Sequence, residues 1–200
     1  MSRIIAGLRR GRRIETPDGP LTRPTADRVR EAFFSALASW AGTIDEPVEQ
    51  WLTELSFADF YAGSGAVGLE ASSRGARTVL LVERDRRTSD VARRNVRELG
   101  LPAQVRTASV ASVLAEPAEQ AFDVCWFDPP YAVGSAELDA LVATALEGGW
   151  LAEDGVVVLE RGRRSDPPRW PEGMDSWSRR YGETVLYWAQ PLRAGDTEES

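Results

Sequence analysis

The chain has 200 residues, a formal net charge of −7 at pH 7, one cysteine and no histidine. This length fits a single α/β domain with a small addition. No apolar run approaches the roughly 20 residues that cross a bilayer, and the N-terminus lacks the apolar core of a signal peptide, so we expect a cytoplasmic protein with no membrane partner. Without histidine we expect no metal site, and we expect Cys125 to be a core residue of a buried strand.

Positive charge is concentrated near the N-terminus. Residues 1–30 contain eight arginines and three carboxylates, a formal balance of +5, which leaves −12 on the other 170 residues. All positive side chains of the sequence are arginines, which bind phosphate through two hydrogen bonds and stack on bases. We therefore expect this basic arm to contact a polyanion, and a solvated surface loop is the alternative interpretation. The expected contact residues are Arg9, Arg10, Arg12, Arg13, Arg23, Arg28 and Arg30.

Two elements are predicted before the central part of the chain. Residues 2–16 have the pattern of a β-hairpin, which is marginally stable alone and needs a surface to pack on. Residues 26–41 carry apolar side chains at helical spacing, and Thr25 is a suitable N-cap. We expect three parts in the chain: a basic arm with its loop (1–24), a main domain (25–190) and a disordered acidic tail (191–200).

After residue 54 the pattern alternates between strand and helix, which is typical of a parallel sheet in an α/β protein. Strands are predicted at 55–60, 78–82, 103–108, 122–127, 155–160, 176–181 and 183–189, and helices up to residue 74 and at 85–99, 109–114 and 136–147.

A glycine-rich turn follows the first of these strands. Gly63, Gly65 and Gly68 have the G-x-G-x-x-G spacing between a strand and a helix. Glycines at such a turn allow a ligand to contact the backbone and allow the helix to pack closely on the strand. The next strand ends at Glu83, which is placed to accept hydrogen bonds from ribose hydroxyls. A nicotinamide dinucleotide site would explain these features equally well.

The stretch Asp-Pro-Pro-Tyr, residues 128–131, directly follows an apolar strand. Two prolines cannot continue the hydrogen-bond ladder of a strand and fix φ near −65°, so the backbone is stiff where the strand ends. This corner would present a carboxylate, a proline carbonyl and an aromatic ring at the edge of the sheet where α/β proteins bind ligands. Asp128 and the Pro129 carbonyl would accept the N–H groups of an exocyclic amine, and Tyr131 would stack on the base. A rigid turn without a binding role is the alternative interpretation.

Together these motifs resemble the Rossmann-like methyltransferases that use S-adenosylmethionine. They are most similar to the family that methylates N2 of a guanine in bacterial 16S ribosomal RNA. The resemblance covers roughly residues 3–190. The hairpin motif Arg-Ile-Ile-Ala-Gly and the Thr-Arg-Pro-Thr stretch are specific to that family, whereas the glycine turn and Asp-Pro-Pro-Tyr occur in many amino-group methyltransferases. The matching stretches are 3–7, 22–32, 61–71, 73–76 and 128–131.

The resemblance implies an α/β, Rossmann-like methyltransferase fold. Its mostly parallel sheet would have seven strands in the order 3-2-1-4-5-7-6, with helices on both faces and a small N-terminal β-hairpin. It also implies S-adenosylmethionine as cofactor, a monomer, and 16S ribosomal RNA or a small-subunit assembly particle as partner. Ser109 stands where the family usually has an acidic residue that holds the adenine amino group, so a hydroxyl or a backbone group would replace it. The implied cofactor-binding residues are Asp59, Ala62, Gly63, Ser64, Gly65, Glu83, Ser109 and Asp128.

Three other functions are weighed against this one. An adenine-N6 methyltransferase acting on DNA or RNA would contain the same Asp-Pro-Pro-Tyr stretch. A non-catalytic RNA-binding factor for ribosome assembly would keep the basic arm, but the intact Asp128 and Glu83 argue against lost catalysis. A nicotinamide enzyme would have no use for the Asp-Pro-Pro-Tyr corner or for the arm.

Overall fold

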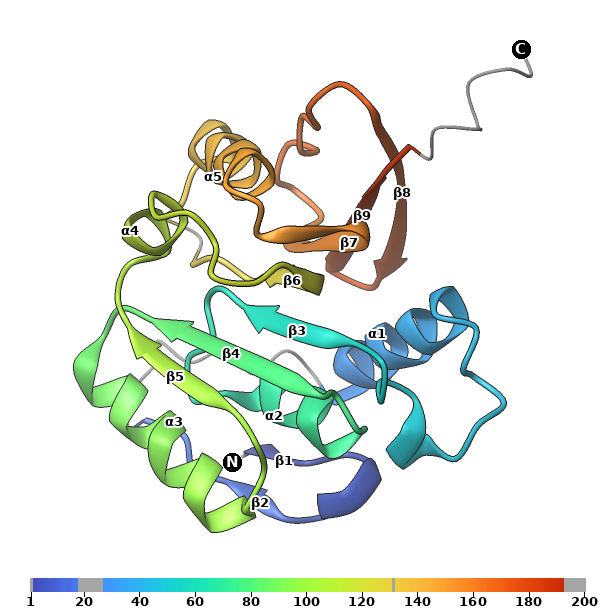
Figure 1. Ribbon diagram of the computed structural model, residues 1–200, viewed down its shortest axis with the longest axis vertical. Coiled ribbons are helices and arrows are strands. Elements are labelled where there is room, and N and C mark those ends of the chain that lie inside the picture. The colour runs from blue at the N-terminus through green and yellow to red at the C-terminus, as the bar shows by residue number, and fades with distance from the viewer. Residues whose placement is uncertain (1, 18–26, 131, 193–200) are drawn as a thin grey trace. The chain divides into compact units, whose positions relative to one another are not determined.

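The computed structural model describes residues 2–17, 27–130 and 132–192 (Figure 1). Contacts divide the chain into two compact units, Met1–Ser109 and Val110–Ser200. The predicted boundary between residues 24 and 25 lies outside the described residues. Within the described ranges, no helix combines the length and the apolar character that crossing a membrane requires.

The N-terminal unit contains a small hairpin and three parallel strands. In the hairpin, Ser2 pairs with Ile14 and Arg3 with Arg13. In the sheet, β4 lies between β3 and β5 and is parallel to both (Figure 1). The elements are β1 (Ser2–Arg3), a 3-10 turn (Gly7–Arg9), β2 (Arg13–Ile14), α1 (Asp27–Trp40), a 3-10 turn (Val48–Gln50), β3 (Ser56–Asp59), α2 (Ala66–Ser73), β4 (Thr78–Glu83), α3 (Arg86–Leu99) and β5 (Gln104–Thr107).

Local signals explain where the helices of this unit begin and end. The Asp85 side chain caps α3 by accepting a hydrogen bond from the Thr88 N–H at 2.8 Å. Gly100 ends the same helix in the left-handed conformation, with φ at 59°. Helix α1 buries an aromatic face, and both Phe33 and Phe34 contact Phe57 of β3 with ring centroids 6.2 Å apart.

The C-terminal unit contains four strands and two helices. Strand β6 is parallel to β7, whereas β9 is antiparallel to both β7 and β8. Burial raises the pKa of the Cys125 thiol far above its usual range, which fits the predicted core position in β6. The elements are α4 (Val110–Leu114), β6 (Phe122–Phe127), α5 (Ser135–Glu147), β7 (Leu151–Gly162), β8 (Met174–Tyr181) and β9 (Thr184–Pro191).

The strand order confirms the predicted fold class. The order is β5-β4-β3 in the N-terminal unit and β6-β7-β9-β8 in the C-terminal unit, which together give the predicted 3-2-1-4-5-7-6. One strand was predicted too short. Strand β7 begins at Leu151 rather than at residue 155, because Leu151 pairs with Phe122 across a register shift. Residues 152–154 (Ala-Glu-Asp) inside this strand show no apolar alternation, so its strand conformation is not visible in the sequence.

Candidate active site

Two acidic strand ends hold the glycine turn between β3 and α2. Glu83, the last residue of β4, accepts a hydrogen bond from the Gly63 N–H at 3.1 Å through Oε2. Its Oε1 accepts the Asp85 N–H at 2.7 Å. Asp59, the last residue of β3, accepts the Gly68 N–H at 3.1 Å through Oδ2. The carboxyl ends of two neighbouring strands are therefore tied to the turn by their own side chains.

The three glycines of the turn are needed for different reasons. Gly63 and Gly65 have φ values of 55° and 86°, in the left-handed region that side chains disfavour. At Gly68 a Cβ would lie 2.2 Å from Leu81 Cδ2, so this glycine lets α2 pack closely on β4. A Cβ at Gly63 would meet no atom of the described residues within 4 Å. The backbone at Gly63 is therefore open to a ligand.

The residues around this turn fit a bound nucleoside cofactor. The Glu83 carboxylate is half-buried, and each of its oxygens accepts one backbone N–H. A carboxylate offers about four acceptor positions, so capacity remains for two ribose hydroxyls. Ala62 and Ser64 are each only 8% exposed and present mainly backbone. Asp59 is 1% exposed and supports the turn, so its direct contact with the cofactor stays a prediction.

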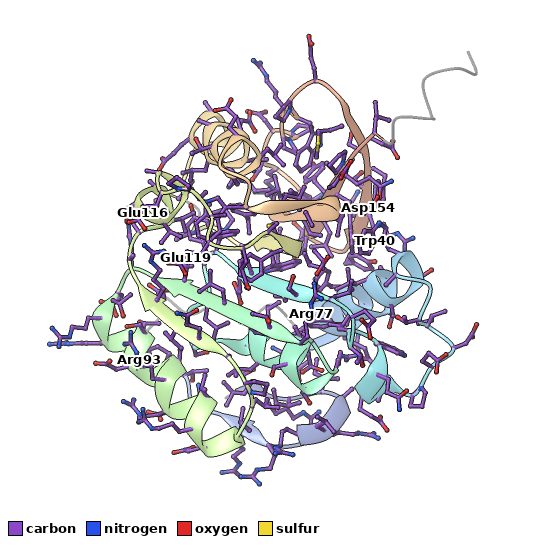
Figure 2. All side chains as sticks on the ribbon, in the orientation of Figure 1. Trp40, Arg77, Arg93, Glu116, Glu119 and Asp154 are labelled. Atoms are coloured by element: carbon purple, nitrogen blue, oxygen red, sulfur yellow. The ribbon has the colours of Figure 1, made fainter. Side chains whose placement is uncertain are left out.

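Polar side chains also gather where β5 ends. The Thr107 hydroxyl lies 2.8 Å from the Ser89 hydroxyl and accepts a hydrogen bond at 2.7 Å from Arg93, which projects from α3 (Figure 2). Ser109, two residues further, is exposed at the end of the N-terminal unit. The adenine contact of Ser109 stays a prediction.

The C-terminal unit carries the predicted acceptor corner. Strand β6 ends in four buried residues, and Asp128 follows them half-buried. Pro129 is buried, and the Pro130 carbonyl accepts the Val133 N–H at 2.9 Å. The Val133 carbonyl in turn accepts a hydrogen bond from Arg161 of β7 at 3.2 Å. The backbone after Asp128 is thus fixed by ring constraint and by hydrogen bonds, while Tyr131 lies outside the described residues.

Comparisons with known proteins identify the family. The family model described as Conserved hypothetical protein 95 matches residues 2–190. Ribosomal RNA small subunit methyltransferase D of Escherichia coli (strain K12) is 36% identical over 159 residues, which are 79% of this chain and 73% of that protein. The protein of the same name from Haemophilus influenzae is 32% identical over 162 residues, 79% of this chain and 77% of its own length. The chain belongs to the family described as Conserved hypothetical protein 95 and is related to these two ribosomal RNA small subunit methyltransferases.

A solved structure has a fold similar to that of this chain. A hypothetical protein of Thermus thermophilus superimposes with a TM-score of 0.75 at 31% identity. The match covers 95% of this chain and 99% of that one.

A buried carboxylate on α2 anchors the arm of this family member. Glu70 is 0% exposed and accepts hydrogen bonds from the Ile5 N–H at 2.7 Å and the Ala6 N–H at 2.9 Å. It also pairs with Arg74 at 3.0 Å and lies 3.9 Å from Arg30. The sequence analysis missed this role, although a lone carboxylate within a helix of small and apolar residues signals a buried partner.

Arg30, which was predicted to contact RNA, is buried in this structure. The Arg30 side chain is 0% exposed, and its Nη2 donates to the Arg3 carbonyl at 2.7 Å and to Asp27 at 3.1 Å. Burial lowers the pKa of Arg30 and of Arg74, and the Glu70 carboxylate opposes both shifts. An arginine still remains charged near neutral pH. Arg30 is therefore an anchor of the arm and not a surface cation.

The other arginines of the arm are more accessible. Arg9 is half-buried, and its Nε donates to the Leu99 carbonyl at the end of α3. The remaining described ones are exposed, so their contact with RNA stays a prediction, and Arg23 lies outside the described residues. Of the predicted contact residues, those exposed are Arg10, Arg12, Arg13 and Arg28.

Among the described residues, no group of three or more carboxylate or cysteine side chains is arranged to hold a metal ion.

Proposed function

We propose that this chain transfers a methyl group from S-adenosylmethionine to the exocyclic N2 amino group of a guanine in 16S ribosomal RNA. The observation that carries the proposal is the rigid corner at Asp128 and Pro129, directly after β6. Many nucleotide-binding proteins have a glycine turn, but a corner that accepts the N–H groups of an amine in the same chain favours methyl transfer to an amino group. Membership of a family that includes ribosomal RNA methyltransferases supports the substrate class.

In this proposal the glycine turn would hold the cofactor. Glu83 would bind the two ribose hydroxyls, while the open backbone at Gly63 would contact the amino-acid part. Ala62, Ser64 and Gly65 would contribute backbone groups, and the hydroxyl or backbone of Ser109 would contact adenine. When bound, the cofactor supplies an electrophilic methyl carbon on a sulfonium centre, and loss of this methyl group breaks the C–S bond and leaves the sulfur as a neutral thioether.

The Asp128 corner would hold the base. The lone pair of a guanine amino group is delocalised into the ring, so the group is a weak nucleophile. If Asp128 and the Pro129 carbonyl each accept one of its N–H groups, they favour the tetrahedral nitrogen that forms as the new N–C bond is made. The methylated nitrogen is acidic, and its surplus proton passes to Asp128 or to water. Tyr131 would stack on the base and fix its plane.

The proposed function also predicts which conformation of the RNA is the substrate. A base inside a duplex cannot present its amino group to a pocket, so the target must be unpaired or leave its stack. The exposed arginines of the arm would then bind neighbouring phosphates, and binding would weaken steeply as salt is raised.

Replacing the carboxylate tests the proposal most simply. Asp128→Ala should lower methyl transfer to small-subunit RNA by about 100-fold or more, the size expected when one group that stabilises a transition state is removed. Affinity for S-adenosylmethionine, measured by calorimetry, should change little. Asp123→Asn in the same strand is the matched control and should keep near-normal turnover. Near-normal turnover of Asp128→Ala would show that the assigned role is wrong, and transfer to duplex DNA rather than RNA would change the substrate class.

A further inference from the structure

One buried side chain contacts both the arm and the glycine turn. Asn95 lies on the inner face of α3 and is 1% exposed. Its Oδ1 accepts the Glu15 N–H at 2.9 Å, and its Nδ2 donates to the Glu15 carbonyl, also at 2.9 Å. Nδ2 also donates to the Ser64 carbonyl at 2.9 Å. Glu15 directly follows β2 of the arm, and Ser64 lies between the two left-handed glycines of the turn.

These three bonds require a carboxamide. Asn95 uses one acceptor and both N–H donors of a single planar group, and three backbone groups would lose a partner if it were removed. An aspartate of the same size would have no N–H donor and would point its charge at two carbonyl oxygens. A buried polar group that loses its partner is destabilised, so the site is specific for asparagine.

The Ser64 contact fixes one end of the turn, and Glu83 fixes the other. Glu83 holds the N–H of Gly63, whereas Asn95 holds the carbonyl that precedes Gly65. Ser64, which has a conformationally permissive glycine on each side, would otherwise sample several conformations. The geometry that the cofactor meets at this turn therefore depends on a side chain that is also fastened to the arm.

We propose that Asn95 is a positioning residue that links the arm to the cofactor turn, so that RNA bound at the arm tightens cofactor binding. This inference rests on the proposed function, in which the arm contacts RNA and the turn holds S-adenosylmethionine. RNA that favours the docked arm also favours the Asn95 contacts and thus the ordered turn. By linkage, the cofactor must tighten RNA binding by the same factor.

The neighbouring ion pair provides a matched control. Arg94 binds the Glu15 carboxylate with hydrogen bonds of 3.0 and 2.8 Å, but no bond of Arg94 reaches the turn in the described residues. Glu15→Gln removes this ion pair and leaves the backbone of residue 15 on Asn95. Asn95→Ala removes all three bonds, and Asn95→Asp keeps the volume while losing both donors.

Affinity for S-adenosylhomocysteine, which allows no turnover, should be measured by calorimetry with and without transcribed 16S ribosomal RNA. In the unmodified protein we expect RNA to lower the Kd about 5-fold or more, within the usual range for coupled sites. Asn95→Ala and Asn95→Asp should bring this ratio close to one, and Glu15→Gln should retain it. A ratio of one in the unmodified protein, a retained ratio in both Asn95 variants, or an equal loss in Glu15→Gln would overturn the inference.

Hydrogen exchange in the unmodified protein gives a test that no folding defect can obscure. RNA alone should slow amide exchange in the turn at residues 63–66, and unchanged exchange would overturn the inference. A failure of the proposed function looks different, because the unmodified protein would then not methylate ribosomal RNA at all. Normal methylation without coupling would reject only the role of Asn95.

Discussion

The glycine turn and the basic arm are both short, irregular segments, but they are held by different kinds of contact. The bonds that fix the turn join residues 9, 20 and 31 positions apart in the chain. Those that fix the arm to Glu70 and Asn95 join residues 64 to 80 positions apart. A motif that is complete within a short stretch reveals its chemistry in the sequence. A segment that is held by residues far away in the sequence does not. Some of its residues anchor the segment, and others are available to bind a partner.

The arginines of the arm show this division. Arg30 is buried against carboxylates, whereas Arg10, Arg12 and Arg13 near the hairpin tip are exposed. Arg30 and the arginines of the tip have the same side chain and lie in the same basic N-terminal stretch of 30 residues. Their roles differ because the Glu70 carboxylate of α2 lies beside Arg30, whereas the arginines of the hairpin tip are exposed to solvent.

The largest effect is expected from removing the anchor of the arm. Glu70→Ala would leave two buried guanidinium groups without their shared carboxylate and two backbone N–H groups without an acceptor. Breaking a buried ion pair costs about 3–5 kcal/mol in the free energy of unfolding, which chemical denaturation would measure. Glu98→Ala, at an exposed position of α3, should stay within about 0.5 kcal/mol. A cost under about 1 kcal/mol for Glu70→Ala would show that the arm is not anchored in this way.

A smaller loss of stability is expected at the turn. In Gly68→Ala the new Cβ would lie 2.2 Å from Leu81 Cδ2, so α2 would have to move away from β4. Overpacking of this kind costs about 1–3 kcal/mol, and the affinity for S-adenosylmethionine should fall with it. Leu81→Ala combined with Gly68→Ala should cost less than the sum of the single changes, because the clash is relieved. Strict additivity of the two costs would contradict close packing as the reason for this glycine.

The exposed arginines should affect RNA binding without affecting the fold. Each of Arg10→Ala, Arg12→Ala and Arg13→Ala should lower the slope of log affinity against log salt by about 1, as expected for one lost phosphate contact. Stability should stay within about 0.5 kcal/mol, and so should the free energy of cofactor binding in the absence of RNA. Arg30→Ala is the opposite case, because it should reduce stability strongly. An unchanged salt slope in all three tip variants would remove the arm from the RNA interface.

The smallest effect concerns the surface ion pair of Glu15. A side-chain hydrogen bond from Arg94 lowers the pKa of Glu15 below its ordinary value of 4.5. A carboxyl group with a lowered pKa in the folded protein contributes stability above pH 4.5, which is lost as the pH falls through the lowered pKa. NMR titration of Glu15 should show this shift, and Arg94→Met should return the pKa towards its ordinary value. A titration that is identical in both proteins would contradict the pairing.

Much of the fold could be predicted because its signals are local. Apolar periodicity predicted the order of strands and helices, and the prolines after β6 marked the end of a strand. The start of β7 was missed because its pairing with β6 passes through a register shift and because Glu153 and Asp154 interrupt the apolar pattern there. Glu70 and Asn95 were missed because a buried polar side chain is defined by partners that only folding brings near.

The candidate site could be predicted in part for the same reason. Gly63, Gly65 and Glu83 were predicted together, and the structure joins Glu83 to Gly63 directly. Arg30 was assigned to RNA because its charge was counted without its burial. Composition gives the sign of the net charge of a segment, whereas burial decides which of its charged side chains are exposed to solvent.

Nucleoside mass spectrometry after reaction with methyl-labelled S-adenosylmethionine tests the central claim most directly. Small-subunit ribosomal RNA that lacks this modification, incubated with the protein and digested, should contain the label in N2-methylguanosine and nowhere else. Label in N6-methyladenosine, or RNA that stays unlabelled while the protein binds the cofactor, would contradict the account.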